Sequence, residues 1–258
     1  MRPAGILIIT MILLAALLSA GCQTQSGTPA TLKIGVVASM TGPASTTGKD
    51  VWQSAQLAAD EINAKGGVFI RSLGKNVTIR LVQGDDESTR EGGQKAVTRM
   101  ITDDRVDILV GGFSSAVVTA HQSIVAEHGV PYIITGASSS TVTHRTDVNT
   151  SMMFHHAPIT DASASKTTIF IDEVMRPAIN SKFGFPADRP LRLAVVYQDS
   201  PFGKGALSAI ESTIAAKGLK VQVVANETFK MGETDFRTIL TSVKAKGPDA
   251  VYPIAFLN

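Results

Sequence analysis

The chain has 258 residues, of which 44% are hydrophobic and 18% charged, and its formal net charge is +2. This length and composition suit a globular protein of one or two domains. The near-neutral charge and the aromatic content of only 5% exclude the basic, aromatic-rich surface of a nucleic-acid-binding protein, so we expect no nucleic-acid partner.

The first 22 residues have the pattern of a bacterial signal peptide. Residues 6–18 are apolar apart from Thr10, and they are too few to span a membrane, which takes about 20 residues. Small residues before Cys22 resemble a lipobox, although Ser19 stands where a leucine is usual. We therefore expect lipidation of Cys22, the single cysteine, and a flexible tether over residues 23–31, with ordinary cleavage as the alternative.

The next part of the chain alternates strand patterns with helical patterns. Strands are predicted over residues 32–38, 77–82, 108–110 and 130–134, and a helix follows each of the first three. A short extended segment at 154–158 then precedes a helix from about 161 to 175, and residues 177–190 are interpreted as a polar connector.

Residues 191–258 repeat the pattern of residues 32–140. Strands predicted over 191–197, 221–229 and 247–256 alternate with two helices, the second of which Thr234 and Asp235 are expected to cap. Such alternation is typical of parallel sheets with helices on both faces. We predict an α/β fold of two Rossmann-like parallel-sheet domains. We also expect the chain to be a fragment with an incomplete second domain, because no helix covers its last strand.

Two hydroxyl-rich loops follow neighbouring predicted strands. Ser114 and Ser115 come after the strand at 108–110 and open a helix, and residues 136–140 come after the strand at 130–134. Open α/β sheets bind ligands at the carboxyl ends of their strands, and a helix N-terminus suits an anion. The two loops therefore predict a site for a small anionic or zwitterionic ligand.

Several motifs, in this order, resemble the branched-chain amino-acid type of periplasmic binding protein, a leucine-binding-protein-like subunit of ABC transporters. They are IGVVASMTGPASTTGKD, AADEINAKGGV, VDILVGG and VPYIITGASSS. The resemblance extends over residues 32–258. It implies a type I periplasmic-binding fold with two domains, here 32–157 and 158–258, joined by a hinge that closes on a ligand.

The resemblance also implies a set of ligand-binding residues. Ser115 matches the serine that holds the ligand carboxylate, and the acidic residue that often pairs with the ligand ammonium would align at or just past Asn258. Two matched positions depart from the family. Thr47 stands where the family often has an aromatic residue, and Phe202 stands where it often has a tyrosine. The matched positions are Thr47, Ser114, Ser115, Gly136, Ala137, Ser138 and Phe202.

The implied function is that of an extracytoplasmic, lipid-anchored solute-binding protein. It would act as a monomer without a cofactor, capture a small amino acid or related amide, and present it to ABC permease subunits. Such a protein is not an enzyme. The first alternative is a ligand-sensing receptor module of the same fold.

A remote alternative is a serine hydrolase that uses Ser163 and Lys166, which form an S-x-x-K string without its companion S-D-N and K-T-G strings. Adjacent histidines at 155 and 156 lack further metal ligands, so no metal site is expected. Asp85 and Asp86 are interpreted as a turn with a solvated carboxylate rather than an acid–base pair. His121 is interpreted as a packed histidine.

Overall fold

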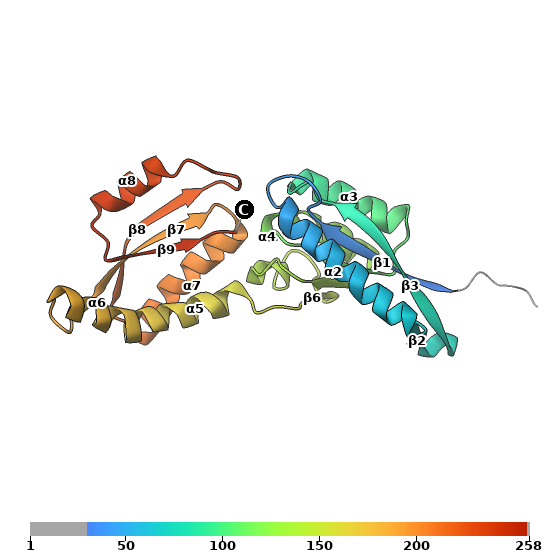
Figure 1. Ribbon diagram of the computed structural model, residues 1–258, viewed down its shortest axis with the longest axis horizontal. Coiled ribbons are helices and arrows are strands. Elements are labelled where there is room, and N and C mark those ends of the chain that lie inside the picture. The colour runs from blue at the N-terminus through green and yellow to red at the C-terminus, as the bar shows by residue number, and fades with distance from the viewer. Residues whose placement is uncertain (1–29, 257–258) are drawn as a thin grey trace, which may run out of the picture.

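The structure, a computed structural model, describes residues 30–256. The predicted signal peptide, Cys22 and nearly all of the predicted tether lie outside the described residues. The described chain forms two α/β lobes side by side, and its C-terminal end lies between them (Figure 1). We call residues 30–155 the first unit and residues 160–256 the second unit. Within the described part of the chain, residues 156–159 join the two.

A six-stranded sheet forms the centre of the first unit, in the order β2-β3-β1-β4-β5-β6. All neighbouring pairs are parallel except β2 with β3. The strands are β1 (Thr31–Ala38), β2 (Val68–Ile70), β3 (Lys75–Asp85), β4 (Ile108–Gly111), β5 (Tyr132–Ile134) and β6 (Met153–His155). The helices are α2 (Ser45–Ala64), α3 (Arg90–Thr102) and α4 (Ser115–His128), with short 3₁₀ turns η1 (Arg71–Leu73) and η2 (Ser140–Val142).

A three-stranded parallel sheet forms the centre of the second unit, in the order β8-β7-β9. The strands are β7 (Leu191–Gln198), β8 (Val221–Phe229) and β9 (Ala250–Ile254). The helices are α5 (Thr160–Phe170), α6 (Arg176–Phe183), α7 (Pro201–Lys217) and α8 (Arg237–Ala245), and a π-helical turn, η3 (Ile171–Met175), joins α5 to α6.

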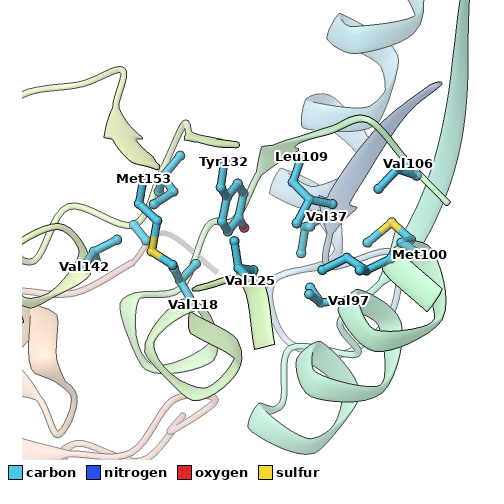
Figure 2. Close-up of a cluster of buried hydrophobic side chains, with 13 residues drawn as sticks. Val37, Val97, Met100, Val106, Leu109, Val118, Val125, Tyr132, Val142 and Met153 are labelled. Carbon is cyan, nitrogen blue, oxygen red and sulfur yellow. The ribbon is translucent and has the colours of Figure 1, made fainter. Parts of the chain in front are cut away.

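The core of the first unit lies between the sheet and helices α3 and α4. Figure 2 shows Val97 and Met100 of α3 directed toward Val37 and Leu109 of the central strands, and all four side chains are fully buried. Burial of one such side chain contributes about 1.5–3 kcal/mol. The apolar face of α3 therefore holds that helix against β1 and β4, and the first hydroxyl loop follows β4.

In the second unit, β7 is buried on both faces. Leu193 and Val195 pack in the cluster that contains Ile210 of α7, whereas Ala194 and Val196 pack with Val243 of α8. A parallel strand with helices on both sides takes this continuous apolar pattern rather than an alternating one. The α/β fold with parallel sheets is confirmed. The exact domain boundary after residue 157 stays a prediction.

Two local predictions are wrong. Residues 177–190 are not a connector throughout, because α6 continues the helix to Phe183 and Gly184 ends it with φ of 70°. Pro177 is tolerated because it follows the π-helical turn η3, where the Arg176 N–H donates to Ile171 O five residues back, so the regular bonding is already interrupted. The capping prediction is wrong in position, because the cap residue of α8 is Phe236, which makes no side-chain cap bond; Asp235 nevertheless accepts the N–H of Arg237, the first residue of α8, at 3.1 Å and also pairs with its guanidinium.

Candidate functional site

Backbone hydrogen bonds hold the two hydroxyl loops side by side at the carboxyl ends of β4 and β5. The N–H of Thr135 donates to Gly111 O at 2.9 Å, and the N–H groups of Gly136 and Ala137 both donate to Gly112 O, at 3.2 and 2.9 Å. These bonds continue the pairing of β4 with β5 beyond the strands. The loops predicted separately therefore form one surface.

Two glycines make the turn after β4 possible. Gly111 and Gly112 have φ of 105° and 75°, which side-chain-bearing residues rarely adopt. The backbone also passes close to its neighbours, since a Cβ on Gly111 would lie 2.2 Å from Val37 O. The Gly112 N–H donates to the same carbonyl at 2.8 Å. This close approach directs the chain into the start of α4.

The first turn of α4 carries both predicted serines. Ser114 occupies the cap position, yet no side chain caps the helix, and the buried Ser114 Oγ has no hydrogen-bond partner among the described residues. Ser115 Oγ accepts the N–H of Ser139 at 3.2 Å and so joins the two loops. An unpaired buried hydroxyl costs about 1–3 kcal/mol, so the Ser114 hydroxyl is a candidate for a ligand contact.

Two cavities lie beside these loops. One, of about 580 Å³, is lined by Thr47, Phe113, Gly136 and His156, among others. The other, of about 170 Å³, is lined by residues of both units, including Ser138 and Phe202. Ser114, Ser115 and Ala137 are buried behind the cavity walls, with exposed fractions of 1%, 0% and 1%.

Ser138 connects the second loop to the second unit. Its hydroxyl lies 2.7 Å from Thr160 Oγ1, and its carbonyl accepts the Thr160 N–H, also at 2.7 Å. Thr160 is the first residue of α5. The Ser138 hydroxyl and carbonyl are therefore engaged at the junction of the two units, and the ligand contact that the resemblance implies for Ser138 stays a prediction.

Three phenylalanines, two of which the sequence analysis missed, form a stack across the two units. The Phe256 ring lies 4.5 Å from that of Phe113 and 4.9 Å from that of Phe202, measured between centroids. Phe113 directly precedes the two serines, and its place beside them in the sequence could have marked it as a candidate wall of the site. Phe256 lies far away in sequence, and no local pattern marked it. The stack supplies an apolar wall next to the hydroxyl loops.

The hydrolase alternative rests on two further candidate residues. Ser163 lines the smaller cavity and Lys166 is exposed on the next turn of α5. Among residues 30–256 there is no cluster of three or more metal-binding side chains. The same part of the chain contains no helix with the length and apolarity needed to cross a membrane.

Asp86 and His121, which the sequence singled out, are both buried in the first unit. The interpretation of Asp86 as a solvated carboxylate is wrong: it is fully buried, and burial raises its pKa. His121 is packed in the core, as predicted, and its burial lowers the pKa of the imidazole to about 3. Neither group reaches the cavities, so neither is a candidate for acid–base chemistry at the site.

Two α/β units, with hydroxyl loops at strand ends and a cavity lined from both units, form the architecture of a two-lobed binding protein. The periplasmic binding protein family model matches residues 31–257, and the chain belongs to this family. The predicted resemblance is confirmed. Since the family consists of binding proteins, the hydrolase alternative with Ser163 and Lys166 is set aside.

Named relatives agree with this assignment. The Leu/Ile/Val-binding protein BraC3 of Rhizobium johnstonii is 28% identical over 223 residues, which cover 86% of this chain and 54% of that protein. An amino acid binding protein of Pseudomonas aeruginosa is 26% identical, over 85% of this chain and 52% of that protein. The chain thus spans about half the length of the curated relatives it matches.

Solved structures share the fold. The branched-chain amino acid transporter substrate-binding protein LivJ of Streptococcus pneumoniae, in complex with isoleucine, has a TM-score of 0.69 and 27% identity, over 88% of this chain and 57% of that one. A solute-binding protein of an R. palustris ABC transporter, in complex with benzoate, has a TM-score of 0.70 at 20% identity, over 88% and 56%. At 20% identity, the similarity to the benzoate-bound protein supports the fold alone.

Proposed function

We propose that this chain is the ligand-binding part of an extracytoplasmic solute-binding protein that captures a small amino acid or related amide for an ABC importer. Binding rather than chemistry is its task. The two units would close on the ligand about the segment 156–159. Ligand binding stabilises the closed arrangement to the extent that the ligand makes contacts with both units that the open arrangement lacks.

The uncapped start of α4 is the observation that carries this proposal. The helix begins at the carboxyl end of β4, and its dipole and free N–H groups favour a negative charge there. The buried Ser114 Oγ without a partner lies at the same place. A ligand carboxylate would accept charge-assisted hydrogen bonds from these donors, which are stronger than those between neutral groups.

The ligand body would lie against the apolar walls. Phe113, Phe202 and Phe256 supply aromatic surface on both units. Since Ser114 is buried, side chains around it would have to move for the ligand to reach it. The relatives named for leucine, isoleucine and valine, and the isoleucine-bound solved structure, support an apolar amino acid. The benzoate-bound solved structure makes an aromatic carboxylate the second ligand to test.

The cellular setting is part of the same proposal. The family is periplasmic, which supports a location outside the cytoplasm. Membrane attachment through a lipid on Cys22, permease subunits as partners, and a monomeric state follow from the sequence analysis. A sensing receptor of the same fold is the alternative. Stimulated uptake by vesicles containing the cognate permease would support transport, whereas binding without any effect on uptake would support sensing.

Replacement of Ser114 by alanine tests the site. The Ser114 Oγ is buried without a protein partner, so its removal relieves a cost, and we expect the melting temperature of Ser114→Ala to equal or exceed that of wild type. The variant should nevertheless lose at least about tenfold in affinity, the equivalent of one hydrogen bond to a charged group. Isothermal titration calorimetry against L-leucine, L-isoleucine, L-valine, their amides and benzoate measures this.

Ser115→Ala and Ser181→Ala are the matched variants for that titration. Ser115→Ala removes the bond to Ser139 and should lower both stability and affinity. Ser181 is exposed on α6 in the second unit, so Ser181→Ala should change neither. Wild-type protein that binds none of these compounds, or Ser114→Ala that binds as wild type does, would contradict the proposal.

A further inference from the structure

The turn after β3 holds the loop after β1 through two carboxylates. Asp85 Oδ1 accepts the N–H groups of Met40 at 2.9 Å and Thr41 at 3.2 Å, and its Oδ2 accepts the Thr41 hydroxyl at 2.8 Å. Asp86 Oδ1 accepts the hydroxyl of the fully buried Ser39 at 2.5 Å. We call residues 39–44 the rim loop and residues 85–88 the clamp turn.

Ser88 adds a third attachment. Its hydroxyl donates to Thr41 O at 2.9 Å and accepts the Ala44 N–H at 3.1 Å. Burial alone would raise the pKa of Asp85. The N–H of Glu87 and the donors of the rim loop reverse this effect and lower that pKa below its ordinary value. The rim loop is thus bonded to the clamp turn at several successive residues.

The clamp turn is strained. Glu87 and Ser88 have φ of 53° and 56°, so two consecutive residues other than glycine adopt the left-handed conformation. Each such residue costs free energy, and the conformation persists only where surrounding contacts fix it. Two sets of contacts fix it here: the N–H groups of Glu87 and Ser88 donate to the Asp85 and Asp86 carboxylates within the turn, and the Ser88 hydroxyl bonds to the rim loop. Strained turns of this kind are enriched at functional sites.

The rim loop leads directly into the wall of the larger cavity. Gly48, in the first turn of α2, packs so tightly on the loop that a Cβ there would lie 2.0 Å from Ser39 O. Thr47, its neighbour, lines the cavity of about 580 Å³. A shift of the Ser39 backbone would therefore move the first turn of α2, and Thr47 with it.

The rim loop is also where the first unit meets the second. A Cβ placed on Gly232, in the turn after β8, would lie 3.5 Å from Pro43 Cγ. Figure 1 shows the loops that precede α2 and follow β8 approaching each other across the gap between the lobes. The clamp turn therefore fixes an edge that a closing second unit contacts.

We propose that Asp85, with Asp86 and Ser88, is a positioning residue of the binding cleft, which holds the rim loop so that Thr47 and Pro43 meet the ligand and the second unit. This role rests on the proposed function. Asp85 contacts no ligand itself. It acts through the rim loop, so its loss should change affinity even where the protein remains folded.

Asp85→Ala and Asp85→Asn separate geometry from charge. Asparagine keeps an oxygen for the two N–H groups and an amide that can donate to the Thr41 hydroxyl, whereas alanine removes every bond. Hydrogen–deuterium exchange of the ligand-free protein is expected to be at least about tenfold faster at Met40 and Thr41 in Asp85→Ala, and within about threefold of wild type in Asp85→Asn. Asp60→Ala, at an exposed position of α2, should behave as wild type.

Affinity is measured on the same proteins, at a temperature where all are folded, with the tightest binder among L-leucine, L-isoleucine, L-valine and benzoate. We expect Asp85→Ala to lose at least about fivefold and Asp85→Asn to stay within about twofold of wild type. Unchanged exchange in Asp85→Ala, or faster exchange with unchanged affinity, would overturn the positioning role. Wild-type protein that binds none of these compounds would overturn the proposed function and this role together, while the exchange rates would still report the attachment of the rim loop.

Discussion

Gly111→Ala is expected to destabilise the first unit by about 3 kcal/mol or more. The backbone at Gly111 has φ of 105°, which an alanine adopts only under strain. The added Cβ would also lie 2.2 Å from Val37 O in the central strand β1, where no flexible side chain can move aside. The two costs add because relief of one does not relieve the other.

Urea unfolding followed by the fluorescence of Trp52, the single tryptophan, measures this change. Trp52 lies on α2 and therefore reports on the first unit. Gly129→Ala is the matched control: Gly129 has φ of 62° at the end of α4, but a Cβ there would meet nothing within 4 Å. We expect the control to lose only about 1 kcal/mol. Equal losses in the two variants would show that the close approach to β1 is not the cause.

His121→Leu is expected to remove about 2 kcal/mol of acid sensitivity between pH 7 and pH 5. In the folded protein, burial lowers the pKa of His121 from 6.5 to about 3. Between those values the unfolded chain binds a proton that the folded chain does not, so stability falls as the pH falls. Both ring nitrogens are buried without partners among the described residues, and leucine should therefore be tolerated at pH 7.

Paired unfolding curves at pH 7 and pH 5 isolate this effect. Asp86 works in the opposite sense, because its raised pKa adds stability that is lost as the pH rises through that pKa. Asp86 is present in both wild type and His121→Leu, so its contribution cancels when their pH dependences are subtracted. Ser123→Ala, at an exposed and non-titrating position on the same helix, should keep the wild-type pH dependence. Identical pH dependence in wild type and His121→Leu would contradict the prediction.

The alternating fold could be predicted because its strands carry long apolar runs. The predicted strand at 191–197 corresponds to β7 at Leu191–Gln198, which is buried on both faces and so needs no polar residue to interrupt it. The short β2 was missed, because three residues carry too little pattern. The extension of the helix to Phe183 was missed because Pro177 suggested a break, whereas tertiary context places it in a helical first turn.

The loops of the candidate site were predictable from local chemistry, and their surroundings were not. A glycine pair followed by two serines after an apolar run indicates a strand, a tight turn and a helix start, and Gly111, Ser114 and Ser115 occupy those places. The contact of Phe256 with Phe113 and Phe202 joins residues distant in sequence, so only the packing of the two units could reveal it. Burial of Asp86 likewise depends on the rim loop folding over it.

The most direct test of the ligand site is a ¹H–¹⁵N NMR titration of the full chain with L-leucine, L-isoleucine, L-valine and benzoate. If the hydroxyl loops hold the ligand carboxylate, the largest shifts will fall on the amides at the start of α4, from Ser114 to Val117, and on Gly136 to Ser138. Smaller shifts should appear around Phe202. Saturable binding with the largest shifts on other parts of the chain would contradict this site, and no saturable shift with any of these ligands would contradict the proposed function itself.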